Sequence, residues 1–171
     1  MKQSNLRAHR PRSTRRISGR AQQDHILDPY QRQQKLHNGT FCPQCGALYH
    51  EGRWQWLARG EKAGRELCAA CRRINDQFPA GVVMLRGDFA REHKEEMIHL
   101  ARHQEEAEKK EHPLNRIISI EEDAQGVVIN TTDIHLPRRI GEAVKSAFHG
   151  AIEESFEKDG YFVRVSWSRA A

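Results

Sequence analysis

The sequence predicts an α+β protein made of a small cysteine-containing module and a larger domain, preceded by a basic arm. Three observations support this prediction. Four cysteines fall in two Cys-x-x-Cys pairs within residues 41–75. Between residues 80 and 171, short apolar runs bounded by Gly and Pro alternate with amphipathic stretches. Residues 1–40 hold nine Lys or Arg and have almost no apolar periodicity.

The composition excludes several classes of protein. A chain of 171 residues has room for one or two small domains, and its mean hydropathy of −0.82 is low. No run of 18 apolar residues is present, which excludes a membrane span, and no apolar core follows the early positive charges, so we expect no secretory signal. We therefore expect a cytoplasmic protein, in which cysteines are metal ligands rather than disulfides.

The N-terminal arm is the most basic part of the chain. Residues 1–40 contain nine basic and only two acidic residues, and residues 76–171 are net acidic. With so little apolar surface, we expect the arm to be disordered. Arg outnumbers Lys seven to two, and Arg binds phosphate bidentately and stacks on bases, which favours a nucleic-acid contact. A solubilising tail and an organellar transit peptide are the alternatives. The candidate contacts in the arm are Arg7, Arg10, Arg12, Arg15, Arg16 and Arg20.

Residues 41–75 contain all the cysteines, as Cys42-Pro-Gln-Cys45-Gly46 and Cys68-Ala-Ala-Cys71. In a Cys-x-x-Cys turn two thiolates reach one tetrahedral ion, and two such pairs complete a closed four-thiolate zinc site. The spacing therefore predicts structural zinc held by Cys42, Cys45, Cys68 and Cys71. A redox pair is the weaker alternative, because no thioredoxin-like pattern surrounds either motif. Catalytic zinc is disfavoured, since four thiolates leave no position for water.

Aromatic and basic residues alternate between the two cysteine pairs. Arg53, Trp54 and Trp56 suit stacking on unpaired bases beside phosphate contacts. The alternative is that both tryptophans cap the small module or attach it to the next domain. Arg72 and Arg73 follow Cys71 directly, so they are further candidates for nucleic-acid contact, or they offset the negative charge of the metal site.

The first half of the larger domain begins with a buried strand at Val82–Leu85, bounded by Pro79 and Gly87. Asp88 is expected to cap one long helix that continues to about Glu111, where Pro113 stops it. Strands at residues 117–120 and 127–129 follow, and the turn at residues 123–126 pairs them as a hairpin.

A second helix is predicted to start between Asp133 and Pro137. Its apolar residues repeat at helical spacing, and we expect it to continue past Gly150 to about Lys158. The last strand spans residues 161–167. The order β-α-β-β-α-β predicts a ferredoxin-like domain over residues 80–171, with two helices on one face of a four-stranded sheet. Its third strand has no aromatic residue, so base stacking on this sheet is not expected, although the sheet is a candidate surface for a protein partner.

Motifs of known enzymes are missing from the sequence, which has no GxSxG, P-loop or GxGxxG. His99 and His103 lie one helical turn apart, a spacing that can bind metal, but they form no HExxH motif. The glutamates that flank them indicate a solvated charged face, so metal binding by these histidines is the weaker alternative. We therefore expect no catalytic activity and no small-molecule substrate.

Three segments together resemble a known family. Phe41-Cys42-Pro-Gln-Cys45-Gly46, Leu67-Cys68-Ala-Ala-Cys71-Arg72 and Gly81-Val82-Val83-Met84-Leu85-Arg86 are similar to the N-terminal half of the large-ribosomal-subunit export adaptor of archaea and eukaryotes, the Nmd-three family. Short uncharacterised bacterial zinc proteins share this arrangement. The resemblance implies contact with the ribosome, in assembly or quality control. This chain has one set of four cysteines where the adaptor has two, so nuclear export is not implied.

The sequence as a whole favours a non-enzymatic zinc protein that associates with RNA or the ribosome. In this interpretation the basic arm supplies affinity, the zinc module positions the protein, and the α+β domain recognises shape or a partner. The alternative is a regulatory protein-interaction module whose basic arm binds DNA.

Overall fold

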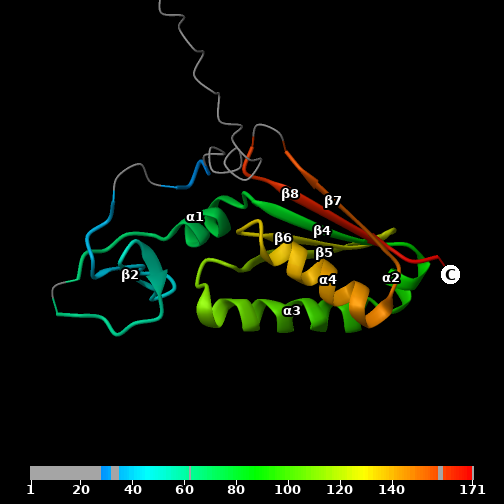
Figure 1. The fold of residues 1–171 in the computed structure, drawn as a ribbon, viewed down its shortest axis with the longest axis horizontal. Helices are drawn as coiled ribbons and strands as arrows, with labels where there is room; N and C mark the ends of the chain where they lie inside the picture. The colour runs from blue at the N-terminus through cyan, green and yellow to red at the C-terminus, as the bar shows by residue number, and fades with distance from the viewer. Residues whose placement is uncertain (1–27, 32–34, 62, 158–159, 171) are drawn as a thin grey trace, which may run out of the picture.

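The computed structural model describes residues 28–31, 35–61, 63–157 and 160–170. Within them the chain is an α+β protein with a three-stranded sheet, a five-stranded mixed sheet and four helices (Figure 1). None of the described helices has the length and apolar character needed to cross a membrane. The six arginines predicted as contacts in the arm, Arg7, Arg10, Arg12, Arg15, Arg16 and Arg20, lie outside the described residues.

The smaller module surrounds the cysteines. Its antiparallel sheet has the order β1-β2-β3, and one helix follows. The elements are β1 (Thr40–Phe41), β2 (Leu48–His50), β3 (Arg53–Gln55) and α1 (Ala69–Asp76). Contacts with this module begin before the predicted boundary at residue 41, because the Tyr30 hydroxyl donates to Asp76 Oδ2 on α1 at 2.8 Å.

The larger sheet has the strand order β5-β6-β4-β8-β7. The central strand, β4, pairs antiparallel with β6 and parallel with β8. The predicted hairpin of β5 and β6 is present. The strands are β4 (Gly81–Arg86), β5 (Ile117–Asp123), β6 (Gly126–Thr131), β7 (Ala151–Phe156) and β8 (Val163–Ser168). The domain therefore has one strand more than the four that the sequence predicts.

Helices α3 (Lys94–Glu111) and α4 (Leu136–Phe148) lie on the same face of this sheet (Figure 1). The core between the layers contains alternate residues of the inner strands together with the apolar stripe of α4. Trp167 is the largest fully buried side chain. The core members that are fully buried include Val83, Leu85, Val127, Ile129, Ile140, Val144, Val163 and Val165.

The single helix predicted from Asp88 to Glu111 is two helices. A short α2 (Asp88–Glu92) ends at His93, whose backbone leaves the helical region with φ −109° and ψ 22°, and α3 begins at the next residue. Asp88 is also not the cap, since the N-cap position is Gly87 and Asp88 lies in the first turn. The break places the His93 ring on Phe89, with ring centroids 4.1 Å apart.

The predicted extension of the second helix past Gly150 is wrong. The helix ends at Phe148, and β7 returns antiparallel to β8 with Ile152 opposite Trp167. His149 and Gly150 both have positive φ, 61° and 89°, and the Trp167 indole N–H donates to the His149 carbonyl at 2.6 Å. Pairing with β8 outweighs the helical propensity of this Ala- and Glu-containing segment, because propensity is a weak preference that tertiary contacts override.

Replacing Gly150 with Ala should destabilise the larger domain. A Cβ at this position would lie 2.6 Å from the Ser168 carbonyl oxygen, and φ is in the left-handed region. We expect a loss of about 1–3 kcal/mol in the free energy of unfolding, measured by denaturant titration. Gly60→Ala is the matched control, because nothing lies within 4 Å of its added Cβ. Equal stability of the two variants would contradict the proposed role of the turn.

Candidate metal centre

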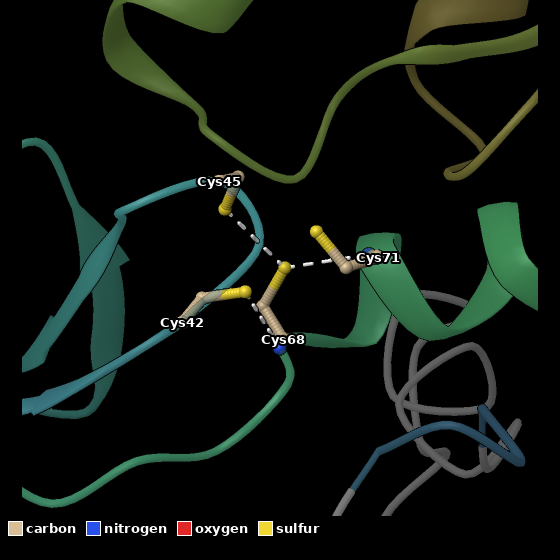
Figure 2. Close-up of side chains that lie close together, drawn as sticks. All are labelled: Cys42, Cys45, Cys68 and Cys71. Carbon is tan, nitrogen blue, oxygen red and sulfur yellow. Dashed lines mark hydrogen bonds between the residues drawn. The ribbon is translucent and has the colours of Figure 1, made fainter.

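The four cysteines converge from two segments of the smaller module. Cys42 and Cys45 lie in the connection between β1 and β2, while Cys68 is the N-cap of α1 and Cys71 lies in its first turn. All four Sγ atoms are within 4.8 Å of one another (Figure 2). Cys42, Cys68 and Cys71 are fully buried. The structure therefore brings together every cysteine that the sequence predicts as a ligand.

The backbone around the first pair forms a tight loop. The Gly46 N–H donates to the Cys42 carbonyl and the Cys42 N–H donates to the Ala47 carbonyl, both at 2.8 Å. Gly46 has φ 82°, a conformation that Gly adopts without the steric cost of a Cβ. This loop turns both sulfurs toward the start of α1.

Backbone amides of the second segment donate to sulfur. The Cys68 N–H lies 3.4 Å from Cys42 Sγ, and the Cys71 N–H lies 3.4 Å from Cys68 Sγ. The second bond is the N-cap of α1, with a sulfur in the place where Ser or Asp oxygen is usual. Amide donors of this kind favour the thiolate form, which is the form that binds metal.

One charged side chain of the larger domain reaches the cluster. The connection between α3 and β5 passes beside the cysteines in Figure 2, and from it Arg116 Nη2 lies 3.2 Å from Cys71 Sγ and 3.4 Å from Cys68 Sγ. Arg116 is only 8% exposed. Its backbone is fixed by Thr132, the residue that follows β6, because Arg116 N–H donates to Thr132 Oγ1 and Thr132 N–H donates to the Arg116 carbonyl, both at 2.9 Å.

Proton sharing within the cluster splits the pKa values of its thiols. The hydrogen bond between the sulfurs of Cys45 and Cys68, 3.8 Å apart, lowers the pKa of Cys45 to about 4 and raises the pKa of Cys68. Burial raises the pKa of Cys71. A metal that binds all four sulfurs must displace the protons of Cys68 and Cys71, so its affinity falls as the pH falls.

The dimensions of the cluster suit a tetrahedral ion. Zinc–sulfur bonds of about 2.3 Å at tetrahedral angles place the sulfurs about 3.8 Å apart. Cys45 Sγ and Cys68 Sγ have this separation, and the other pairs need only a small contraction from at most 4.8 Å. Four thiolates around a divalent cation leave a net charge of −2. The Arg116 guanidinium offsets one of these two negative charges. The residues present can therefore hold zinc, with every coordination position occupied by sulfur.

The two tryptophans between the cysteine pairs have different surroundings. Trp54 is half-buried and packs against the cysteine cluster, and its ring meets Tyr49 edge-on with centroids 5.6 Å apart. Trp56 is 39% exposed, and its indole N–H donates to the Lys109 carbonyl at the end of α3, at 2.5 Å. Trp54 thus has the capping position that the sequence left as an alternative, whereas Trp56 remains at the surface beside the exposed Arg53.

The two arginines after Cys71 also differ from each other. Arg73 is 1% exposed, and its guanidinium pairs with Asp28 Oδ1 at 2.5 Å and lies over the Tyr30 ring at 4.3 Å. Its predicted role in nucleic-acid binding does not agree with this burial, and it instead attaches residues 28–31 to α1. Arg72 is half-buried, and its side chain donates to the Tyr30 carbonyl.

Sequence reasoning missed Arg116. It stands next to an apolar strand without a neighbouring Cys, His or Gly, and 45 residues separate it from Cys71. Leu114 of the same connection packs on the cluster too. Their only signal in the sequence is that both lie within three residues after Pro113, where a helix has ended and the chain is free to turn.

Comparisons of the chain with protein-family models, with curated proteins and with solved structures found no match.

Protein prepared without chelators should contain one zinc ion per chain, and Cys42→Ser or Cys71→Ser should release it. The small module buries too little apolar surface to fold without the ion, so loss of zinc should also unfold it. Elemental analysis and circular dichroism measure both effects. The control is His99→Ala with His103→Ala, because both histidines are exposed on α3, away from the cluster. A wild-type content well below one zinc per chain would contradict the assignment.

Replacing Arg116 with Met removes the cation and keeps the length of the side chain. We expect zinc to be lost to a competing chelator at a concentration about 10–100-fold lower, the usual effect of removing a partner of a metal ligand. Arg116→Lys should retain part of the affinity. Arg102→Met is the matched control on the exposed face of α3, and an equal effect of both Met variants would show that the contact with sulfur is unimportant.

Proposed function

We propose that this protein is a non-enzymatic zinc protein that associates with RNA, either free or in the ribosome. The observation that supports it most directly is the division of roles around the cysteines. The centre itself is enclosed and saturated with sulfur, whereas cationic and aromatic side chains of the same module face solvent. A closed four-thiolate site stabilises a fold and leaves no position for water or substrate, so the function is expected on the surface.

Three arginines of the small module face solvent. Arg53, Arg59 and Arg65 are all exposed, and the exposed acidic residues among the described part of residues 41–75 are Glu51 and Glu61. The guanidinium of Arg59 lies 4.0 Å from the centre of the Phe41 ring, so its charge stays at the surface while its plane packs on the module. Such an array favours phosphate over an acidic protein surface, because the planar guanidinium binds phosphate bidentately and stacks on bases.

The proposal extends to the folds of the two parts of the protein. We propose a zinc ribbon for the small module and a ferredoxin-like fold, extended by β7, for the larger domain. The support is the order β5-β6-β4-β8 of the four expected strands, with two helices on one face. The similarity of the cysteine motifs and of Gly81–Arg86 to the Nmd-three family favours the ribosome as the site of action. Reduced thiols at the centre suit the reducing cytoplasm.

RNA binding should weaken steeply with salt. Residues 1–27 contain seven Lys or Arg and one acidic residue. If about half of these cations neutralise phosphates, the slope of log K against log salt should be roughly −2 to −3, and deleting residues 1–27 should flatten it. Ending the deletion there keeps the Asp28–Arg73 pair.

Fluorescence anisotropy at several salt concentrations measures the slope, with a duplex DNA of the same length as comparison. Sedimentation of the tagged protein with ribosomal particles at two salt concentrations tests the ribosome directly. Preference for the DNA would favour the regulatory module with a DNA-binding arm. Absence of salt-dependent binding to RNA and to ribosomes would overturn the proposal.

A further inference from the structure

The small module and the larger domain enclose a groove between them. One wall is residues 52–57, which include β3, and the other is residues 110–115, which follow the end of α3. Its volume is about 510 Å³. Every residue that lines it is among the described ones, and a second hollow beside it is formed by Trp56, Glu106, Lys109 and Lys110.

The most exposed aromatic side chain of the small module stands at this groove. Trp56 is 39% exposed and its neighbour Leu57 is 45% exposed. The hydrogen bond from the Trp56 indole to the Lys109 carbonyl uses the edge of the ring and fixes its orientation. Among the described residues no other ring and no cation stacks on its face. A fixed aromatic face that lacks a partner is the element on which an unpaired base stacks.

Charges at the rim fit a phosphate backbone. Arg53 lines the wall from the small module and Lys110 lines the opposite wall, and both are exposed. Lys109 adds a third cation beside Trp56, while Glu106 and Glu111 are the acidic groups nearby. The cations lie on both walls of the groove. An RNA segment that places a base on Trp56 therefore has a cation on each side for the flanking phosphates.

We propose that this groove binds an unpaired segment of RNA, with a base stacked on Trp56 and phosphates held by Arg53 and Lys110. The inference rests on the proposed RNA association and names the site and the single-stranded substrate. A duplex does not fit this arrangement, because the bases of a duplex are stacked on one another and present only their edges. Both walls belong to the site, so it exists only while the two parts of the protein stay in contact, through Arg116 and the cysteines and through the Trp56–Lys109 hydrogen bond.

Trp56→Ala tests the stacking. Its affinity for a short single-stranded RNA should fall roughly 5- to 150-fold with an unchanged salt slope, because base–aromatic stacking releases no counterions. Trp56→Phe keeps a ring face and should retain most of the affinity. Lys110→Gln should reduce the salt slope by about 1. Arg102→Gln, a matched loss of charge on the same helix but outside the groove, should change neither quantity.

Zinc content and circular dichroism establish that each variant is folded. If Trp56→Ala does not fold, wild-type protein is cross-linked by ultraviolet light to RNA that contains 4-thiouridine, and the attachment sites should fall within residues 52–57 or 110–115. Unchanged affinity of a folded Trp56→Ala, or cross-links confined to other segments, would overturn the groove while leaving RNA binding through the arm intact. A Trp56→Ala variant that binds RNA normally but no longer binds a protein that the wild type binds would also overturn it. No RNA binding by the wild type would overturn both proposals.

Discussion

The contact between the Arg116 guanidinium and the sulfurs of Cys68 and Cys71 joins the two parts of this protein. A buried arginine is stable only where its charge is compensated, and here the groups in contact with it are the sulfurs of Cys68 and Cys71, which become thiolates when they bind a metal. The small module thus lacks a complete charge balance without the larger domain, and Arg116 lacks a partner without the cysteines. Thr132, the residue that follows β6, fixes the backbone of Arg116, so the position of the centre is tied to the end of a strand of the larger sheet.

The Trp and Arg residues around the cysteines show that a pattern in the sequence does not tell which of these side chains are exposed. Trp54 and Trp56 are two residues apart, yet one packs on the cysteines and the other faces solvent. Arg72 and Arg73 are neighbours, and only the second is fully buried in a pair with Asp28. Each outcome depends on what the larger domain and residues 28–31 place against the module, and these contacts are distant in sequence.

The elements that sequence predicts well are those whose signals are local. The two cysteine pairs, the strand Gly81–Arg86 and the hairpin that turns before Gly126 are each marked by spacing or by Gly and Pro. The segment Ala151–Phe156 has residues that favour a helix, and it becomes an edge strand because β8 pairs with it along its whole length. Arg116 could not be identified because its role depends on thiols that are brought near it only by the fold.

The position of β4 in the centre of the larger sheet has a consequence for synthesis of the chain. The partner of Gly81 on β6 is Thr131, and its partner on β8 is Val163, which is 82 residues later. At about 5–20 residues per second, this apolar strand waits roughly 4–16 s on the ribosome before both of its edges are covered. Val82–Leu85 therefore lacks one of its two neighbouring strands until β8 has been made, whereas all four cysteines of the small module are synthesised before β4 begins.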